Sequence, residues 1–176
     1  GKGHGTDRGL VAGLLGMRPD DERIPDSFEI ARKMSLSYSF GIANLTSAHP
    51  NSVVLEVKGK SGRTLEVQAC SLGGGRIMIN RLDGLDVNCS CEIPTLIVHN
   101  LDQPGHVAEV TSMLAHKSVN IANMSLYRDK RGGSAVMVVE MDQPLPKESL
   151  EWLEHLEGIV KVTYINVTEG EEDDVL

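Results

Sequence analysis

The sequence predicts an α+β protein made of two unequal parts. In the C-terminal part, short apolar runs alternate with helical patterns in the order strand, helix, strand, strand, helix, strand. In the N-terminal part, two short helical patterns precede a series of alternating strands, which is typical of a small α+β domain. Hydrophobic residues make up 40% of the 176 residues and aromatic residues only 3%, so we expect an aliphatic core.

The C-terminal part opens with an apolar run at 95–101, which we expect to form a buried strand. Pro104-Gly105 then turns the chain. The next segment predicts an amphipathic helix of about three turns. Its apolar residues recur at helical spacing: Val107, Val110, Met113 and Leu114.

The second strand opens at Val119, and a hairpin turn at 129–133 leads into a buried strand at 134–141. A second helix is expected to carry Pro146 in its first turn, where a proline is favoured. The segment 159–167 then alternates between apolar and polar residues as a final strand. The resulting order, βαββαβ, is the ferredoxin-like arrangement.

The N-terminal part begins with a helix that Thr6 or Asp7 can cap and that Gly16 ends. A capping box at 26–29 predicts a second short helix, which runs to Lys33. The residues that follow alternate, which predicts an edge strand at Tyr38, Phe40 and Ile42. Turn signals then separate three further strands, at 53–57, 65–69 and 77–82.

We expect four segments along the chain. An extended connection starts at Asp86, and the linker is placed at 89–94. It separates a first domain at 1–88 from a second at 95–168, and an acidic tail follows at 169–176. The tail holds five of the 25 carboxylates behind the net charge of −8, and we expect it to be disordered.

Composition excludes several classes of function. The chain has no basic stripe and few aromatic residues, so we expect no nucleic acid to bind. No stretch is long enough to span a membrane, and we expect no signal peptide. Three cysteines do not make a disulfide framework, which favours a cytoplasmic protein.

The loop after the first C-terminal strand suits a zwitterionic ligand. Asp102 can accept a charge-assisted hydrogen bond from an ammonium group. The backbone N–H groups of Gly105, His106 and Val107, at the start of a helix, suit a carboxylate. Asn120 offers both a donor and an acceptor. The alternative is that Asp102 and Asn120 only cap or tie turns.

This loop, Leu101 to His106, followed by Ser118-Val119-Asn120-Ile121, resembles the ACT domain, a small-molecule-binding module of amino-acid metabolism. The resemblance implies that two copies pair side by side and bind an amino acid at their interface. The residues expected to bind this effector lie in the loop and at the start of the second strand: Asn100, Asp102, Gln103, Gly105, His106, Val107, Asn120 and Ile121.

Two glycine-rich patches precede this domain. In the first, 1–7, we consider a catalytic contribution from His4, Thr6 and Asp7, against the alternative of a helix cap. In the second, the backbone of Gly73-Gly74-Gly75 and the side chain of Arg76 are candidates for binding an anion or substrate. The alternative there is a plain bulge or hairpin.

Taken in order, these patches, the segment 21–25 and the ACT-like part resemble the β chain of bacterial iron–sulfur-dependent L-serine dehydratase. The resemblance implies a catalytic α chain as partner, whose [4Fe–4S] cluster acts on serine to give pyruvate and ammonia without pyridoxal phosphate. It also implies that the first domain is similar to the allosteric substrate-binding domain of some phosphoglycerate dehydrogenases. The family's β chain has a further N-terminal segment, so the first domain is expected to be incomplete.

We expect no metal in this chain. Cys89 and Cys91 alternate on an extended segment and would point to opposite faces, and Cys70 lies far away in the sequence. Cluster sites usually need four thiolates, or three and an open iron. The six histidines show no ligand spacing.

The expected function is therefore that of a regulatory and structural part of a lyase, with L-serine as effector and a homodimer formed through the ACT domain. One alternative is a dimerisation module that binds no ligand, with any serine activation in the first domain. A third reading, an independent catalyst, has little support because no nucleophile–base pair or cofactor motif is present.

Overall fold

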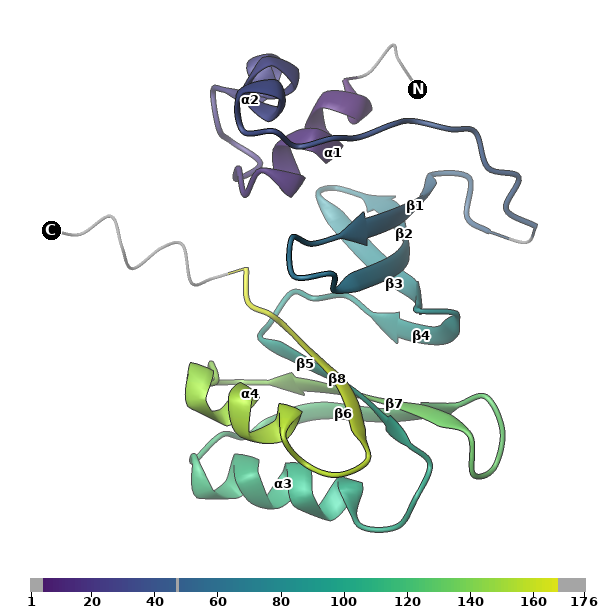
Figure 1. Ribbon diagram of the computed structural model, residues 1–176, viewed down its shortest axis with the longest axis vertical. Helices are drawn as coiled ribbons and strands as arrows, with labels where there is room; N and C mark the ends of the chain where they lie inside the picture. Colours follow the sequence, from purple (N-terminus) through teal and green to yellow (C-terminus); the bar gives the residue numbers. More distant parts are fainter. Residues whose placement is uncertain (1–4, 47, 168–176) are drawn as a thin grey trace, which may run out of the picture. The chain divides into compact units, whose positions relative to one another are not determined.

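The computed structural model describes residues 5–46 and 48–167 (Figure 1). Contacts divide the chain into two units, 1–46 and 47–176, which we describe separately. This division differs from the linker predicted at 89–94, because the strands before that linker pack against those after it. The four-segment domain scheme drawn from the sequence stays a prediction, and its tail lies outside the described residues.

The first unit contains two short helices, α1 (Thr6–Leu14) and α2 (Ser27–Lys33), with a 3₁₀ turn, η1 (Ile24–Asp26), before α2. Small and aliphatic residues are buried where these helices meet: Val11, Ala12 and Ala31. The hydroxyl of Ser27 also donates a hydrogen bond to the Arg8 carbonyl at 3.1 Å. Both predicted helices are therefore present.

The predicted N-terminal caps of both helices are wrong, whereas Gly16 follows the C-cap of α1 at φ 80°, as predicted for the end of that helix. The N-cap of α1 is Gly5, at φ 69°, and no side chain caps this helix, because the helix already begins at Thr6. Asp7 instead accepts a hydrogen bond from the N–H of Arg8. The capping box is not formed either: η1 ends at its first residue, Asp26, which makes no side-chain cap hydrogen bond, and Glu29 pairs with Lys33 at 2.8 Å.

The predicted edge strand at Tyr38, Phe40 and Ile42 is also wrong. These residues adopt neither helix nor strand, and the described part of the first unit offers no strand for them to pair with. Tyr38 and Phe40 instead pack with Phe28, with ring centroids 5.5–6.3 Å apart. The alternation therefore builds an aromatic cluster, which is a common way for such rings to pack.

The second unit begins with an antiparallel sheet whose strands follow chain order: β1 (Ser52–Lys58), β2 (Thr64–Gly73), β3 (Arg76–Leu82) and β4 (Leu85–Cys89). The three predicted strands are confirmed. β4 was missed, because its residues were interpreted as an extended connection. The turn before it takes positive φ at Asp83 and Gly84, as a tight two-residue hairpin requires.

The second sheet and its helices give the predicted βαββαβ order: β5 (Thr95–Leu101), α3 (His106–His116), β6 (Ile121–Arg128), β7 (Ser134–Met141), α4 (Lys147–Glu154) and β8 (Ile159–Ile165). The strand order is β6-β7-β5-β8, all antiparallel neighbours. Pro146 is the N-cap of α4, one residue before the predicted position.

The second sheet is covered on both faces, and Figure 1 shows α3 and α4 on one side of it and the first sheet on the other. On the helix side, Leu96 and Val98 of β5 join a core with residues of α3 and α4. On the opposite side, Ile97 packs with Leu82 and Val87 of the first sheet. The double cover explains why β5 is a continuous apolar run rather than an alternating one.

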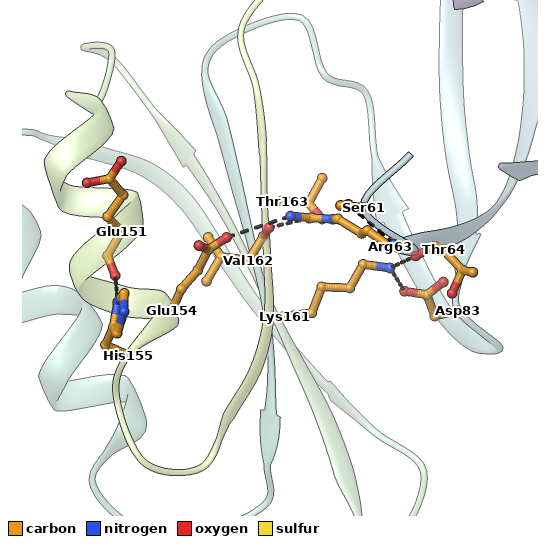
Figure 2. Close-up of polar contacts among 10 residues, drawn as sticks. All are labelled: Ser61, Arg63, Thr64, Asp83, Glu151, Glu154, His155, Lys161, Val162 and Thr163. Carbon is orange, nitrogen blue, oxygen red and sulfur yellow. Dashed lines mark hydrogen bonds and ion pairs between the residues drawn. The ribbon is translucent and has the colours of Figure 1, made fainter. Parts of the chain in front are cut away.

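Polar side chains also join the two sheets (Figure 2). Arg63, in the turn before β2, donates to the carbonyl of Val162 and, at 3.0 Å, to the hydroxyl of Thr163. Lys161 of β8 donates to Asp83 Oδ2 at 2.7 Å. Because these bonds link the turns of the first sheet to β8, they fix how the two sheets meet.

Candidate functional site

The predicted effector loop opens onto a cavity of ≈ 240 Å³ at the C-terminal end of β5. The cavity is bounded by the end of β5, the start of α3, the end of β6 and the first half of β7. Its lining residues are Asn100, Asp102, Gln103, His106, Val107, Leu126, Tyr127, Arg128, Ala135 and Met137. The structure thus brings five of the eight predicted effector residues together.

Asn100 supplies a buried polar atom at the floor of this loop. Its side chain is 6% exposed, and its Nδ2 donates to the Leu101 carbonyl at 2.7 Å. Its Oδ1 has no hydrogen-bond partner among the described residues. A buried acceptor without a donor is costly, so this atom favours a ligand that brings one.

Asp102 ties the loop to the β6–β7 hairpin. Its Oδ2 accepts from the N–H of Gly132 at 2.9 Å and from Arg128 Nη1 at 3.0 Å. The hydrogen bond from Gly132 lowers the pKa of this carboxyl most, and the bond from Arg128 lowers it further. Asp102 is therefore ionised near neutral pH. The structure therefore gives Asp102 the turn-tying role of the alternative interpretation, and both bonds use only one of its two oxygens.

The start of α3 lacks a side-chain cap. Its N-cap residue is Gly105, at φ 106°, which contributes no side-chain acceptor. The orphan N–H groups of the first turn, together with the helix dipole, form a favourable environment for an anion. This is the geometry expected from the sequence for binding a carboxylate.

His106 is held in place at the same point. It is 6% exposed, and its Nδ1 lies 2.9 Å from Glu109 Oε2. Its Nε2 has no hydrogen-bond partner among the described residues. The ring lies directly against Gly158, where an added Cβ would be only 2.6 Å from Nε2.

Asn120 and Ile121 do not lie at the cavity within one chain. β5 and β6 both pair antiparallel with β7, so they run in the same direction, and the start of β6 lies at the far end of the sheet. Asn120 donates from its side chain to Asp142 Oδ2 at 2.6 Å and from its backbone to Gln143 Oε1 at 2.7 Å. Their role in binding an effector stays a prediction.

Sequence reasoning missed the β6 and β7 side of the cavity, above all Arg128. The hairpin turn at 129–133 was predicted, and its antiparallel strands place Arg128 at the same edge as the loop. The missing information was the pairing of β7 with β5, which sets Leu101 opposite Ser134. Local periodicity does not encode which strand lies at the centre.

Comparison with known proteins now decides the family. Residues 94–157 match the ACT domain family. The chain is 34% identical, over 167 residues, to the protein named "L-serine dehydratase, beta chain" from Peptoniphilus asaccharolyticus, covering 94% of this chain and 75% of that protein. The chain belongs to the L-serine dehydratase β-chain family.

A second β chain agrees with this assignment, and part of the chain is also similar to a dehydrogenase. The probable L-serine dehydratase β chain of Bacillus subtilis is 34% identical over 164 residues, covering 93% of this chain and 74% of that protein. A D-3-phosphoglycerate dehydrogenase of Methanocaldococcus jannaschii is 31% identical over 90 residues, covering 51% of this chain and 17% of that enzyme. The family resemblance drawn from the sequence is confirmed.

The candidate residues of the two glycine-rich patches lie far from the cavity loop in the sequence of this β chain. His4 lies outside the described residues, and Thr6 and Asp7 form the first turn of α1. Gly73, Gly74 and Gly75 all take positive φ and close the β2–β3 hairpin, and Arg76 is exposed beside them. The hairpin geometry accounts for the glycines, and a catalytic or anion-binding role stays a prediction.

The structure corrects the prediction for the cysteines. Cys89 and Cys91 do not face opposite ways, because residues two apart on an extended segment lie on the same face. Cys91 also takes φ 56°, and the two Sγ atoms are 3.2 Å apart. With Cys70, the chain has three free thiols, so only a cluster site with three thiolates and an open iron is available to it. No three His, Cys, Asp or Glu side chains gather to hold a metal in the part of the chain that the structure describes. The cluster implied by the family does not fit this chain's own residues.

One further finding concerns membranes. Among residues 5–46 and 48–167, none of the helices combines the length and the apolar character needed to cross a lipid bilayer.

Proposed function

We propose that this chain is the regulatory and structural β chain of an iron–sulfur L-serine dehydratase and binds L-serine as an effector. The reaction, L-serine to pyruvate and ammonia, then takes place on a partner α chain that carries the [4Fe–4S] cluster. The names of the relatives and the ACT match support this proposal. We place the protein in the cytoplasm, where its three free cysteines would stay reduced.

The cavity beside Asn100 carries the effector part of the proposal. An amino acid has a carboxylate for the uncapped start of α3 and an ammonium for an acceptor. Asn100 Oδ1 is a neutral, buried acceptor that needs a donor. The second oxygen of the Asp102 carboxylate is a negatively charged acceptor. Serine is small, so a volume of ≈ 240 Å³ is sufficient for it.

A homodimer would complete this site. β6 is an edge strand of its sheet, so its outer backbone groups are free to pair with a second copy. Antiparallel pairing of two β6 strands would bring Asn120 and Ile121 of one copy beside Arg128 of the other. The predicted effector residues that one chain separates would then meet at the interface.

The proposed effector acts by favouring one arrangement of the α and β chains. Such coupling is typically worth about 1–3 kcal/mol. The alternative, a module that dimerises without binding a ligand, rests on the bonds that already engage Asp102 and Asn120. In that case any serine activation would reside in the first part of the chain.

Calorimetry on the purified chain tests the proposal, with L-serine as ligand and glycine and D-serine as controls. We expect stereoselective binding of L-serine, weakened about tenfold or more by Asn100→Ala or Asp102→Ala, because each removes an acceptor for the ammonium. Asn88→Ala, an exposed asparagine on β4, is the matched control and should bind as the parent does.

Two further variants separate the alternatives. Weaker binding in Asn120→Ala, with the dimer intact by light scattering, would support a site shared between two copies. Binding that survives Asn120→Ala and fails in Arg76→Ala would place serine in the first part of the chain. A chain that dimerises and binds no amino acid at millimolar concentration would support the dimerisation module instead.

A further inference from the structure

The two cysteines at the crossing between the sheets form a close pair. Cys89 is the last residue of β4, and Cys91 precedes the strand β5. Their Sγ atoms are 3.2 Å apart, and both side chains are buried, at 1% and 6% exposure. Together they belong to the core between the two sheets.

The backbone brings these thiols together at a cost. In an extended strand, residues two apart project side by side on one face, yet at a separation near the two-residue rise of about 7 Å. Cys91 instead takes φ 56°, a left-handed conformation that is strained for a residue with a side chain. Such strain is retained where the surrounding structure imposes it, and it often marks a functional position.

The environment separates the two thiols chemically. A hydrogen bond from the Cys91 thiol lowers the pKa of Cys89, against the opposing effect of burial. The same pairing, with burial, raises the pKa of Cys91. One sulfur therefore has thiolate character while its neighbour keeps its proton, which is the arrangement of an attacking and a resolving cysteine.

We propose that Cys89 and Cys91 form a dithiol site that hydrogen peroxide oxidises to an intramolecular disulfide. The Cys89 thiolate attacks one oxygen of the peroxide, breaking the O–O bond to give a sulfenic acid and hydroxide. The Cys91 sulfur then displaces the hydroxyl from the Cys89 sulfur, forming the S–S bond, and its proton leaves with that hydroxyl as water. Peroxide takes up both electrons, and a small-molecule thiol reverses the change by disulfide exchange.

Cys70 provides an internal control for this proposal. It is 5% exposed, so it is buried as deeply as the pair, and it lies on β2. Burial alone would make all three thiols equally unreactive. A faster reaction at Cys89 and Cys91 would therefore reflect their proximity and the lowered pKa of Cys89.

The experiment treats the full folded chain with hydrogen peroxide, stops the reaction with acid, alkylates remaining thiols under denaturing conditions and measures intact mass and peptides. We expect the peptide that contains both Cys89 and Cys91 to lose two hydrogen atoms. This disulfide should form on the order of tenfold faster than Cys70 is oxidised. A small-molecule thiol should restore the original mass. Cys70→Ser should behave as the parent does.

The variants Cys89→Ser and Cys91→Ser should lose the disulfide, and Cys91→Ser should accumulate sulfenic acid at Cys89, detected with dimedone. Peptide mapping of the parent alone decides the matter if either variant fails to fold by circular dichroism. Oxidation of all three cysteines at one rate, direct conversion to sulfinic acid, or a disulfide that forms only in denaturant would each overturn the proposal.

Discussion

The contact between His106 and Gly158 predicts a measurable coupling between the cavity loop and the start of β8. Gly158 has φ 83°, and a Cβ there would lie 2.6 Å from Nε2 and 2.7 Å from Cε1 of His106. Gly158→Ala therefore has two costs. The backbone conformation costs about 1–2 kcal/mol for a residue with a side chain, and displacing a packed ring costs about 1–3 kcal/mol. We expect a total loss of about 2–5 kcal/mol in the free energy of unfolding.

The chain contains a matched control for the backbone part. Gly84 has φ 82°, and a Cβ added there meets no atom within 4 Å. Gly84→Ala should therefore show only the cost of the backbone conformation, about 1–2 kcal/mol. The difference between the two alanine variants isolates the contact with His106.

A double-mutant cycle in urea completes the test. In a His106→Ala background the added methyl group has space, so Gly158→Ala should cost no more than Gly84→Ala does. A coupling energy of about 1–3 kcal/mol is expected. Equal losses for Gly158→Ala and Gly84→Ala in the parent chain, or additive effects in the cycle, would refute the inferred contact.

Three further outcomes follow from the packing between the sheets. Ile97→Ala should lower the free energy of unfolding by about 2–5 kcal/mol, because its side chain is fully buried between the sheets. A loss below about 1 kcal/mol in urea denaturation would mean that the first sheet does not cover this side chain. Arg63→Ala should cost about 1 kcal/mol, since it removes two hydrogen bonds from a side chain that is 46% exposed, whereas Arg76→Ala should cost close to nothing. Burial lowers the pKa of His99 from 6.5, although Asp83 opposes this effect and Lys161 and Arg63 add to it. The unfolded chain then binds the proton more readily, so His99 contributes a loss of stability as the pH falls below about 6.5; His99→Gln should remove that part of the pH dependence in thermal melts, and an unchanged profile would contradict the assignment.

The sequence was most informative where one local pattern had one structural solution. The apolar run at 95–101 is buried on both faces as strand β5, and Pro104-Gly105 directs the chain into α3. Asp83-Gly84 likewise carries a turn signal, and its residue types favour positive φ, although the strand β4 that completes this hairpin was missed. The loop around Asp102 lies at a cavity because its position follows directly from these elements, and its predicted role in binding an effector stays a prediction.

Features that depend on a distant partner were not predictable in this way. Tyr38 and Phe40 alternate as a strand would, yet they pack on Phe28 because no strand is available for pairing in the described part of their unit. Arg128 joins the cavity through the pairing of β7 with β5, which local patterns do not encode. Cys89 and Cys91 meet because of one backbone angle, which the sequence alone does not reveal for a residue other than glycine.

The position of β5 also determines how the second unit exchanges its amide hydrogens. β5 has a hydrogen-bonded strand on each edge and a packed layer on each face, so its central amides should exchange only when the whole unit unfolds. β6 has one neighbouring strand and should exchange through local opening. A ligand that orders the cavity would therefore slow exchange mainly in β6 and its hairpin, while β5 would report the global stability of the unit.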